Sequence, residues 1–377
     1  MARKTSVVFV VVALGALVAG PGPALAGGSC QGRAPTIVGT QGNDKLEGTR
    51  FADVISGLGG ADVIKALAGN DYVCGGDGND KIEGANGHDR IEGEGGNDTM
   101  QGGRGDDRLD GGSDTDTASY KASTTPVDAS LDIRAAIGEG ADAIVETERL
   151  IGSEHGDTLT GDAGKNSITG LGGADRIEGL GGADIQKGGV GDDRIHGGDG
   201  LDSHYGGPGD DFMDGGDGQD TPSFKFSRDP VTVDVAEGTA VGEGADTFVN
   251  MEIVAGSRHG DTLLGDDEGN TFYPLGGDDH VDGRGGFDFV VYVQSAAGVT
   301  VDLGAGTASG EGDDTFDFVE GAVGTAFADE LLGDDFDNSF YGLSGNDTLD
   351  GRGGSDSLIG GTDTDSCLNG ENVSECE

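Results

Sequence analysis

Aspartates recur every nine residues in the first third of the chain. They stand at Asp44, Asp53, Asp62, Asp71, Asp80, Asp89, Asp98, Asp107 and Asp116. Carboxylate oxygens are ligands for hard cations, and Ca²⁺ accepts about six to eight oxygens, backbone carbonyls included. The turns between these aspartates are rich in glycine and expose such carbonyls. Residue types and spacing therefore predict a row of calcium sites.

Other cations fit this donor set less well. Mg²⁺ demands octahedral geometry and keeps much of its water. Zinc and copper favour cysteine and histidine ligands, and the sequence has no cluster of these residues. Several bound Ca²⁺ ions are the expected cofactor.

The nine-residue unit divides into a glycine-rich turn and a short strand. In the segment from Gly57 to Asp110, glycine precedes each aspartate by two positions and an apolar residue follows it by two, as in Gly60, Asp62 and Ile64. Tight turns need glycine for positive φ angles and close backbone approach. The strand has room for one inward apolar side chain, and a period of nine is not helical.

Two units make one coil, and successive coils stack as parallel strands. Residues 18 positions apart then lie over one another, as Asp62 over Asp80. The spacing of about 4.8 Å brings carboxylates close enough to repel unless a cation lies between them. The predicted fold is all-β, a parallel β-roll (a β-helix or solenoid), with almost no helix in the mature chain.

Three interruptions separate the repeat arrays. Each spans 41 residues between aspartates, from 116 to 157, from 220 to 261 and from 288 to 329. They share alternating apolar runs such as Val231, Val233 and Val235, typical of strands, and a glycine-acidic turn. They are a second, longer repeat type. Because 41 is not a multiple of nine, we expect these spacers to bulge from the array or to cap it.

The predicted organisation follows from these boundaries. The segments are a signal peptide at 1–26, an N-terminal segment with the first array at 27–118, spacers at 119–151, 222–255 and 292–323, further arrays at 152–221, 256–291 and 324–366, and a disulfide-containing end at 367–377. The predicted calcium-binding residues are Asp53, Asp62, Asp71, Asp80, Asp89, Asp98, Asp107, Asp116, Asp175, Asp184, Asp193, Asp202, Asp211, Asp220, Asp279, Asp288, Asp347, Asp356 and Asp365.

The later arrays are less regular than the first. Asn166, Asn270 and Asn338 take the second aspartate position of their arrays, which indicates a starting role with less need for charge. Gln186 and His204 stand where an apolar residue is expected, so the second array has a less regular interior.

The composition limits the partners of the chain. Among 377 residues, 71 are acidic and 22 are basic, for a net charge of −49. This balance excludes nucleic acid as a partner, because phosphate binding needs clustered lysine and arginine. Self-repulsion on this scale opposes a compact state unless cations accompany the fold. With 78 glycines and 34% apolar residues, the chain favours stacked units that share a thin core.

The start of the chain resembles a secretory signal. Arg3 and Lys4 precede an apolar run, and a small-x-small pattern at 24–26 predicts a mature chain that begins at Gly27. No other segment is apolar enough to span a membrane. The four cysteines of a secreted chain allow three pairings of two disulfides, and we favour pairing within each end, Cys30 with Cys74 and Cys367 with Cys376.

Three functions fit these features. The leading one is a secreted, extracellular calcium-binding β-roll that folds on binding Ca²⁺ and has no catalytic activity. The alternative is a calcium-stabilised adhesion protein whose spacers bind cell-surface or matrix polymers. An extracellular enzyme ranks third, because the spacers resemble one another and a single active site would make one of them different. Acidic pairs such as Asp106 and Asp107 arise by chance among 71 acids.

The repeats resemble a known family. The segments GGDGNDKIE at 75–83 and GGRGDDRLD at 102–110 are similar to the nonapeptide of hemolysin-type calcium-binding (RTX) repeats. The resemblance covers most of 39–366, and the two ends look like those of secreted actinobacterial calcium-binding repeat proteins. It implies a parallel β-roll with calcium in the turns, bound by the sixth-position aspartates and by turn carbonyls. The toxin, protease and lipase activities of other members are not carried over, because no segment remains for a separate catalytic domain.

Overall fold

The computed structural model describes residues 29–376, which form strands and no helix. The predicted signal peptide lies outside the described residues. The chain divides into two compact units, 1–179 and 180–377, and each is described by itself. Among residues 29–376, no segment forms a helix long and apolar enough to cross a membrane.

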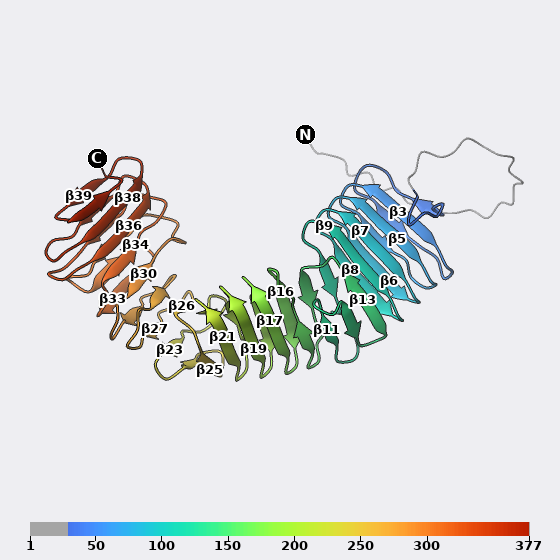
Figure 1. Cartoon of the computed structure of the whole chain (residues 1–377), viewed down its shortest axis with the longest axis horizontal. Coiled ribbons are helices and arrows are strands. Elements are labelled where there is room, and N and C mark those ends of the chain that lie inside the picture. The colour runs from blue at the N-terminus through green and yellow to red at the C-terminus, as the bar shows by residue number, and fades with distance from the viewer. Residues whose placement is uncertain (1–28, 377) are drawn as a thin grey trace, which may run out of the picture. The chain divides into compact units, whose positions relative to one another are not determined.

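Unit 1 is built from short strands that follow one another around a coil (Figure 1). They are β1 (Ile37–Val38), β2 (Lys45–Glu47), β3 (Val54–Gly59), β4 (Val63–Lys65), β5 (Tyr72–Asp77), β6 (Lys81–Asn86), β7 (Arg90–Gly95), β8 (Thr99–Arg104), β9 (Arg108–Ser113), β10 (Thr117–Ser119), β11 (Asp128–Ser130), β12 (Ala135–Ile137), β13 (Ala141–Val145), β14 (Arg149–Ile151), β15 (Thr158–Thr160) and β16 (Ser167–Gly172). β17 (Arg176–Gly182) contains the division at residue 179.

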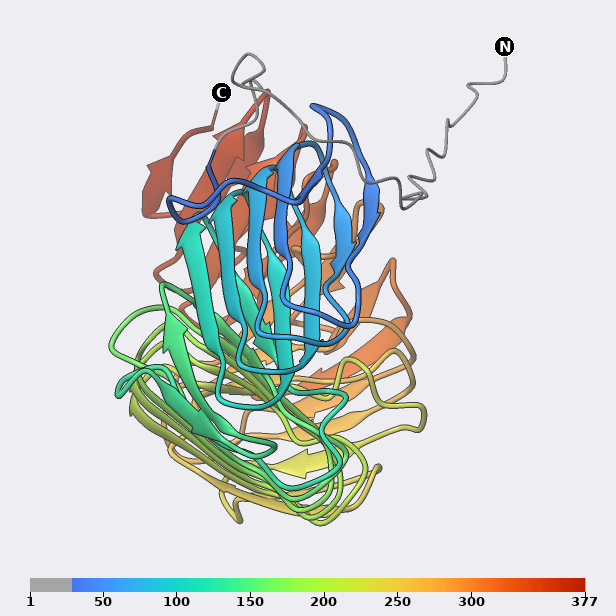
Figure 2. The ribbon, with the colours of Figure 1, turned by 90° about the vertical axis from the view of Figure 1, so that its right-hand side faces the viewer.

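Successive coils stack in the predicted register. In the first array, the odd-numbered strands form one wall of the coil and the even-numbered strands form the other. Within each wall, neighbouring strands pair in parallel. Val63 pairs with Lys81, and Lys81 pairs with Thr99, each 18 residues further on. Figure 2 shows these strands of the first array lying side by side. The prediction of a parallel β-roll with two nonapeptides per coil is confirmed.

Two facing rows of apolar side chains, one from each wall, fill the space between the walls. They hold the eighth residue of each nonapeptide, including Ile55, Ile64, Ile82 and Leu109, none more than 1% exposed. Each fully buried aliphatic side chain contributes about 1.5–3 kcal/mol relative to an exposed one. The core is therefore thin, with one such side chain from each wall in every coil, and every coil depends on its neighbours to cover it.

The fourth position of the turn requires glycine in much of the array. Gly87 has φ of 144°, and a methyl group there would collide with the carbonyl oxygen of Gly69 in the coil below. We predict that Gly87→Ala lowers the free energy of unfolding by about 3 kcal/mol or more, because backbone strain adds to the clash. Gly42→Ala is the matched control, since only Thr40 Oγ1, at 3.9 Å, approaches the added carbon. Urea unfolding in saturating calcium measures both variants, and equal midpoints would contradict the prediction.

Unit 2 repeats the same construction (Figure 1). Its strands are β18 (Ile185–Val190), β19 (Arg194–Gly200), β20 (Ser203–Tyr205), β21 (Phe212–Gly218), β22 (Thr221–Pro222), β23 (Thr232–Asp234), β24 (Thr239–Val241), β25 (Ala245–Val249), β26 (Ile253–Ala255), β27 (Thr262–Leu264), β28 (Thr271–Tyr273), β29 (His280–Asp282), β30 (Phe289–Val291), β31 (Thr300–Asp302), β32 (Thr307–Ser309), β33 (Asp313–Asp317), β34 (Gly321–Val323), β35 (Glu330–Leu332), β36 (Ser339–Ser344), β37 (Thr348–Asp350), β38 (Ser357–Thr362), β39 (Ser366–Leu368) and β40 (Asn372–Ser374).

The spacers neither bulge from the array nor cap it, and that expectation was wrong. In the first spacer, β13 pairs in parallel with β9, and β11 pairs in parallel with β15. β12 runs antiparallel between β11 and β13. The second and third spacers repeat this order with β25, β24, β23 and with β33, β32, β31. The extra residues of each spacer, which do not fit a period of nine, form one reversed strand within the wall. The coils on either side of the spacer therefore remain part of one continuous stack.

Two arginines fasten the second and third spacers to the array that follows each of them. Arg284 donates to both carboxylate oxygens of Asp234, at 2.8 and 2.7 Å, and to the Gly265 carbonyl. Arg352 binds Asp302 and the Gly333 carbonyl in the same way. Such bidentate pairs add geometric specificity to charge attraction. They fix where the spacer lies against the turn.

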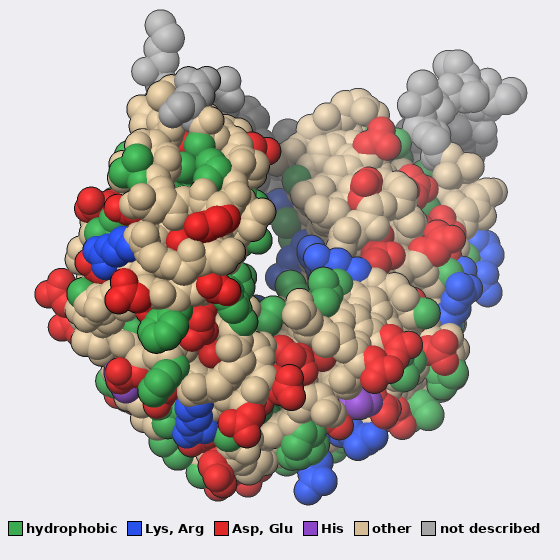
Figure 3. All heavy atoms as spheres, turned by 60° about the vertical axis from the view of Figure 1, so that its left-hand side comes forward, with side chains coloured by type: hydrophobic (Ala, Val, Ile, Leu, Met, Phe, Trp, Pro, Cys, Tyr) green, Lys and Arg blue, Asp and Glu red, His purple; other side chains and the backbone are tan. Residues whose placement is uncertain are grey.

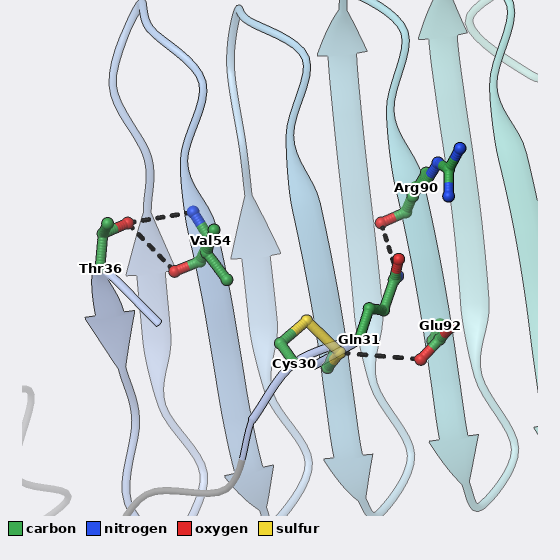
Figure 4. The surroundings of a disulfide bond; sticks show 7 residues. Cys30, Gln31, Thr36, Val54, Arg90 and Glu92 are labelled. Atoms are coloured by element: carbon green, nitrogen blue, oxygen red, sulfur yellow. Dashed lines mark hydrogen bonds between the residues drawn. A yellow bond between two sulfur atoms is a disulfide. The ribbon is translucent and has the colours of Figure 1, made fainter. Parts of the chain in front are cut away.

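Both ends of the array carry a disulfide, with the pairing favoured from the sequence. Cys30 is bonded to Cys74, and Cys367 is bonded to Cys376. Figure 4 shows the segment at Cys30 lying against the strands of the first array, where the Gln31 side chain donates to the Arg90 carbonyl. Each bond closes a loop at an end where stacked coils would otherwise fray.

The interior of the second array contains two polar side chains, as the sequence predicts. Gln186 and His204 are neighbours on β18 and β20, and both are fully buried. Gln186 donates to the His196 carbonyl at 2.8 Å, whereas neither ring nitrogen of His204 has a hydrogen-bond partner. Burial lowers the pKa of His204 to about 4, so this imidazole stays neutral in the fold near pH 7.

Candidate metal centre

One oxygen of each sixth-position aspartate is held by the neighbouring coil. The backbone N–H of Asp62 donates to Asp80 Oδ1, and that of Asp80 donates to Asp98 Oδ1, both at 2.7 Å. The same bond recurs on the opposite edge, where Asp71 N–H donates to Asp89 Oδ1 at 2.8 Å. We call these two rows the aspartate ladders. The sequence brings the carboxyls into line, and these bonds orient them.

The second oxygen of most ladder aspartates is buried and has no partner. Such Oδ2 atoms belong to Asp62, Asp71, Asp80, Asp89, Asp98, Asp107, Asp116, Asp202, Asp211, Asp220, Asp279, Asp288, Asp347, Asp356 and Asp365. The exposure of these residues does not exceed 4%. A buried carboxylate oxygen without a partner is costly, and an ionised one needs a counter-charge. The ionised ladders therefore need cations as counter-charges.

A glycine leaves the space beside most of these oxygens. A methyl group on Gly57 would collide with both Asp62 Oδ2 and the carbonyl oxygen of Gly75, the first glycine of the next coil. Gly84 has the same relation to Asp89 Oδ2 and the Gly102 carbonyl. A carboxylate oxygen and a backbone carbonyl thus converge on one place in each turn. An all-oxygen donor set of this kind suits Ca²⁺.

The second residue of the nonapeptide separates two kinds of turn. In open turns this residue has positive φ, as in Leu58 at 78° and Glu94 at 77°, and the aspartate Oδ2 has no N–H donor. In closed turns the second residue is threonine, serine or aspartate, and its N–H donates to the sixth side chain. Thr49 N–H donates to Asp53 Oδ2 at 2.7 Å, and Thr325 N–H donates to Asp329 Oδ2 at 2.6 Å. Closed turns satisfy their acid without a cation.

Most of the predicted calcium-binding residues fall in open turns. In the turns of Asp175, Asp184 and Asp193, the second residue also has positive φ, of 90° at Leu171, 74° at Leu180 and 119° at Gly189. Asp53 is the exception, because the Thr49 hydroxyl also donates to its Oδ2, at 2.9 Å. Asparagine marks closed turns: Asp266 N–H donates to Asn270 Oδ1 at 2.9 Å. The asparagines at the starts of arrays need no cation.

Three aspartates of the spacers also belong to the ladders and were not among the predicted ligands. Asp142 Oδ1 accepts from Asp107 N–H at 2.9 Å, and Asp246 and Asp314 take the same role for Asp211 and Asp279. All three are buried. The signal was present, since each follows the glycine-acidic turn of its spacer, GEGAD or GEGDD, which shares the G-x-G-x-D spacing of the nonapeptide. Tyr292 donates to Asp314 Oδ2 at 2.7 Å, so here a hydroxyl partners the second oxygen.

Burial raises the pKa of many ladder carboxyls above the ordinary 3.8, and those of Asp62, Asp89 and Asp211 are examples. Neighbouring acids raise it further in many cases, and the N–H bond to Oδ1 lowers it. The pKa is about 6 for Asp62, Asp80, Asp116, Asp220 and Asp347, about 7 for Asp89, Asp98, Asp279 and Asp288, and about 8 for Asp211. Without a cation, these sites favour a proton.

Softer metals find no comparable site in the described residues. The only group there that mixes cysteine with acids is Cys74, Glu92 and Glu94. Cys74 is in a disulfide and offers no thiolate. The chemistry of the ladders is therefore that of carboxylate and carbonyl oxygens.

Comparison with known proteins places the repeats in a family. The family model of the RTX calcium-binding nonapeptide repeat (4 copies) matches residues 47–82, 83–118, 151–186, 187–222 and 323–367. These segments make up half of the chain, and they contain most of the open turns. No curated protein is significantly similar to the chain. The resemblance seen in the sequence is confirmed, and the chain belongs to the RTX calcium-binding nonapeptide repeat family.

Proposed function

We propose that this protein is a secreted, non-catalytic β-roll that folds when extracellular Ca²⁺ binds its aspartate ladders. The observation that carries this proposal is the row of buried Oδ2 atoms without partners. In the absence of calcium these carboxylates oppose folding, and in its presence they are satisfied. Binding free energy then becomes folding free energy. Affinity per site is expected in the range of extracellular modules, about 10⁻⁴–10⁻³ M.

Secretion is supported by the signal-like start and by two disulfides, which persist in oxidising compartments. Calcium is scarce inside cells, so a chain with net charge −49 would stay unfolded there. Acidic side chains are spread over the face shown in Figure 3, with Lys and Arg in smaller groups between them. Absence of catalysis is supported by the three similar spacers, none of which carries a distinctive set of catalytic residues.

Adhesion remains a second candidate, and one surface cluster in unit 2 favours it. Lys187 and Lys225 each lie within 5.5 Å of the ring centres of Tyr205 and Phe226. Phe226 is 63% exposed, and Lys225 and Phe226 belong to the second spacer. A basic, aromatic cluster on an acidic protein suits an anionic matrix polymer. Loss of surface retention in Phe226→Ala with unchanged calcium binding would support this role.

The two kinds of turn provide the test of calcium binding. We predict that Asp80→Asn, in an open turn, lowers the number of Ca²⁺ ions bound per chain by at least one. Asparagine still accepts the N–H of Asp62, so the lost charge is the main change. Asp53→Asn is the matched control in a closed turn and should bind as many ions as the unaltered chain. Isothermal titration with Ca²⁺ measures both, and equal loss in the two variants, or no binding by the unaltered chain, would contradict the proposal.

A further inference from the structure

At the end of each array, a glutamate replaces the next ladder aspartate. Asp98 N–H donates to Asp116 Oδ1 at 2.7 Å, as elsewhere in the ladder, but Asp116 N–H donates to Glu148 Oε2 at 2.9 Å. The same exchange occurs at Glu252 and Glu320, which accept from Asp220 and Asp288 at 3.1 and 3.0 Å. Glu371 accepts from Asp356 at 2.7 Å. All four glutamates lie outside the segments that match the repeat family.

The backbone places each glutamate in the register of a sixth-position residue. Thr117 pairs with Arg149, which follows Glu148, and Arg149 N–H donates to the Asp116 carbonyl at 2.9 Å. The same bond runs from Lys81 to the Asp62 carbonyl within the array, also at 2.9 Å. The carboxylate therefore reaches the ladder although the local sequence is not a nonapeptide. The glutamate side chain is longer than that of aspartate, which allows its carboxylate to reach the ladder N–H from a backbone that follows a different path.

A backbone carbonyl accompanies the glutamate at all four places. The residue two positions before it has positive φ: 49° at Glu146, 55° at Asn250, 52° at Phe318 and 54° at Asn369. A methyl group on Gly111 would collide with the Glu146 carbonyl and meet Asp116 Oδ2 at 2.5 Å. Gly215, Gly283 and Gly351 face the corresponding pairs of oxygens. Positive φ costs about 1 kcal/mol or more in non-glycine residues, yet three residue types adopt it here.

The remaining oxygen at each place is buried and has no partner. Asp116, Asp220, Asp288 and Asp356 are all 0% exposed, and none of their Oδ2 atoms accepts a hydrogen bond. Each place thus repeats the features of an open turn: an aspartate oxygen without a partner, a carbonyl beside it and a second carboxylate on the ladder. A hard divalent cation is the ligand that this oxygen set accepts.

We infer that Glu148, Glu252, Glu320 and Glu371 each complete a calcium site that lies beyond the nonapeptide repeats. The inference rests on the proposed calcium function of the ladders. It means that neither a spacer nor the C-terminal end stops a row of ions, because each supplies the carboxylate of the last site. The motif is a left-handed residue, any residue, then glutamate, at 146–148, 250–252, 318–320 and 369–371.

The test counts calcium ions bound by the full mature chain. A variant with Glu148, Glu252, Glu320 and Glu371 changed to glutamine keeps an acceptor for the ladder N–H and loses four charges. We expect it to bind up to four fewer Ca²⁺ ions than the unaltered chain in isothermal titration. The control variant changes four exposed glutamates, Glu47, Glu154, Glu268 and Glu330, to glutamine. It has the same net charge and should keep the full count.

Equal ion counts in the two variants would overturn the inference and leave the proposed function standing. An unaltered chain that binds no calcium would instead overturn the proposed function. If far-UV circular dichroism shows that the fourfold variant does not fold in saturating calcium, the single changes Glu252→Gln and Glu268→Gln decide. The inference then requires one ion fewer in the first and none fewer in the second.

Discussion

Removal of calcium with EGTA should convert the far-UV spectrum of the chain from that of a β protein to that of an unfolded chain. The described core is thin, and many carboxylate oxygens are buried beside it without partners. Each such oxygen disfavours the fold by about 1–3 kcal/mol when nothing satisfies it. Folded domains have a net stability of only about 5–15 kcal/mol, and the sum of these costs exceeds it.

Circular dichroism at equal protein concentration, with Ca²⁺ and with EGTA, measures this transition. Addition of excess Ca²⁺ should restore the β spectrum, whereas Mg²⁺ at the same concentration should not. The disulfides remain intact in both conditions, so reduction does not enter the comparison. The same β spectrum with and without calcium would show that the ladders do not depend on a cation.

Acid should stabilise the metal-free chain, which is the reverse of its effect on calcium binding. Ladder carboxyls such as Asp62, Asp89 and Asp211 have pKa values of about 6, 7 and 8 in the fold, against 3.8 when unfolded. The folded state therefore binds more protons, and its stability falls as pH rises. The stabilisation is fully present below about pH 4, and it is lost progressively as pH rises through the folded pKa values, up to about pH 8.

The titration of His204 has the opposite effect on stability, and the effect of the ladder carboxyls outweighs it. Its pKa of about 4 in the fold lies below the ordinary 6.5, so protonation of this one residue favours unfolding as pH falls from 6.5 to 4. The ladder carboxyls far outnumber it. In buffer free of divalent ions, the far-UV β spectrum should therefore be stronger at pH 5 than at pH 8, where the metal-free chain is unfolded. Affinity for Ca²⁺ should be about tenfold or more weaker at pH 5.5 than at pH 8, since protons compete for the oxygens. A metal-free chain with more β structure at pH 8 than at pH 5 would contradict the sign.

The regular part of the fold could be predicted because its determinants are local and repeated. Gly60, Asp62 and Ile64 each meet one requirement of the coil: a turn glycine, a ladder carboxyl and an inward apolar side chain. Because the same three residue types recur every nine positions, the pattern is easy to recognise in the sequence. The 18-residue register, the apolar rows and the absence of helix in the described residues followed from it. The pairing of Cys30 with Cys74 was favoured from proximity in the chain, and stacking brings them together.

The spacers and the closed turns needed the structure. A reversed strand such as β12 depends on pairing with both neighbours, and no local pattern at 135–137 distinguishes it from a loop. The period also marked Asp53 and Asp62 alike, although the second residue of their turns, Thr49 or Leu58, decides whether the carboxyl keeps a hydrogen-bond donor. The glutamates of the spacers lie off the period altogether.

Each array begins with closed turns, and the order of these turns does not depend on calcium. Two of them precede the open turns of every array, with Asp44 and Asp53, Asp157 and Asn166, Asp261 and Asn270, and Asp329 and Asn338 as their sixth residues. Their side chains are satisfied within the turn, so these coils can order first and present a finished edge to the next. Growth from such an edge has a direction, toward the C-terminus, and four points of origin. Each of the four arrays would then nucleate at its own closed turns and fold toward its C-terminal end. Folding of the whole chain would not depend on a single nucleation event.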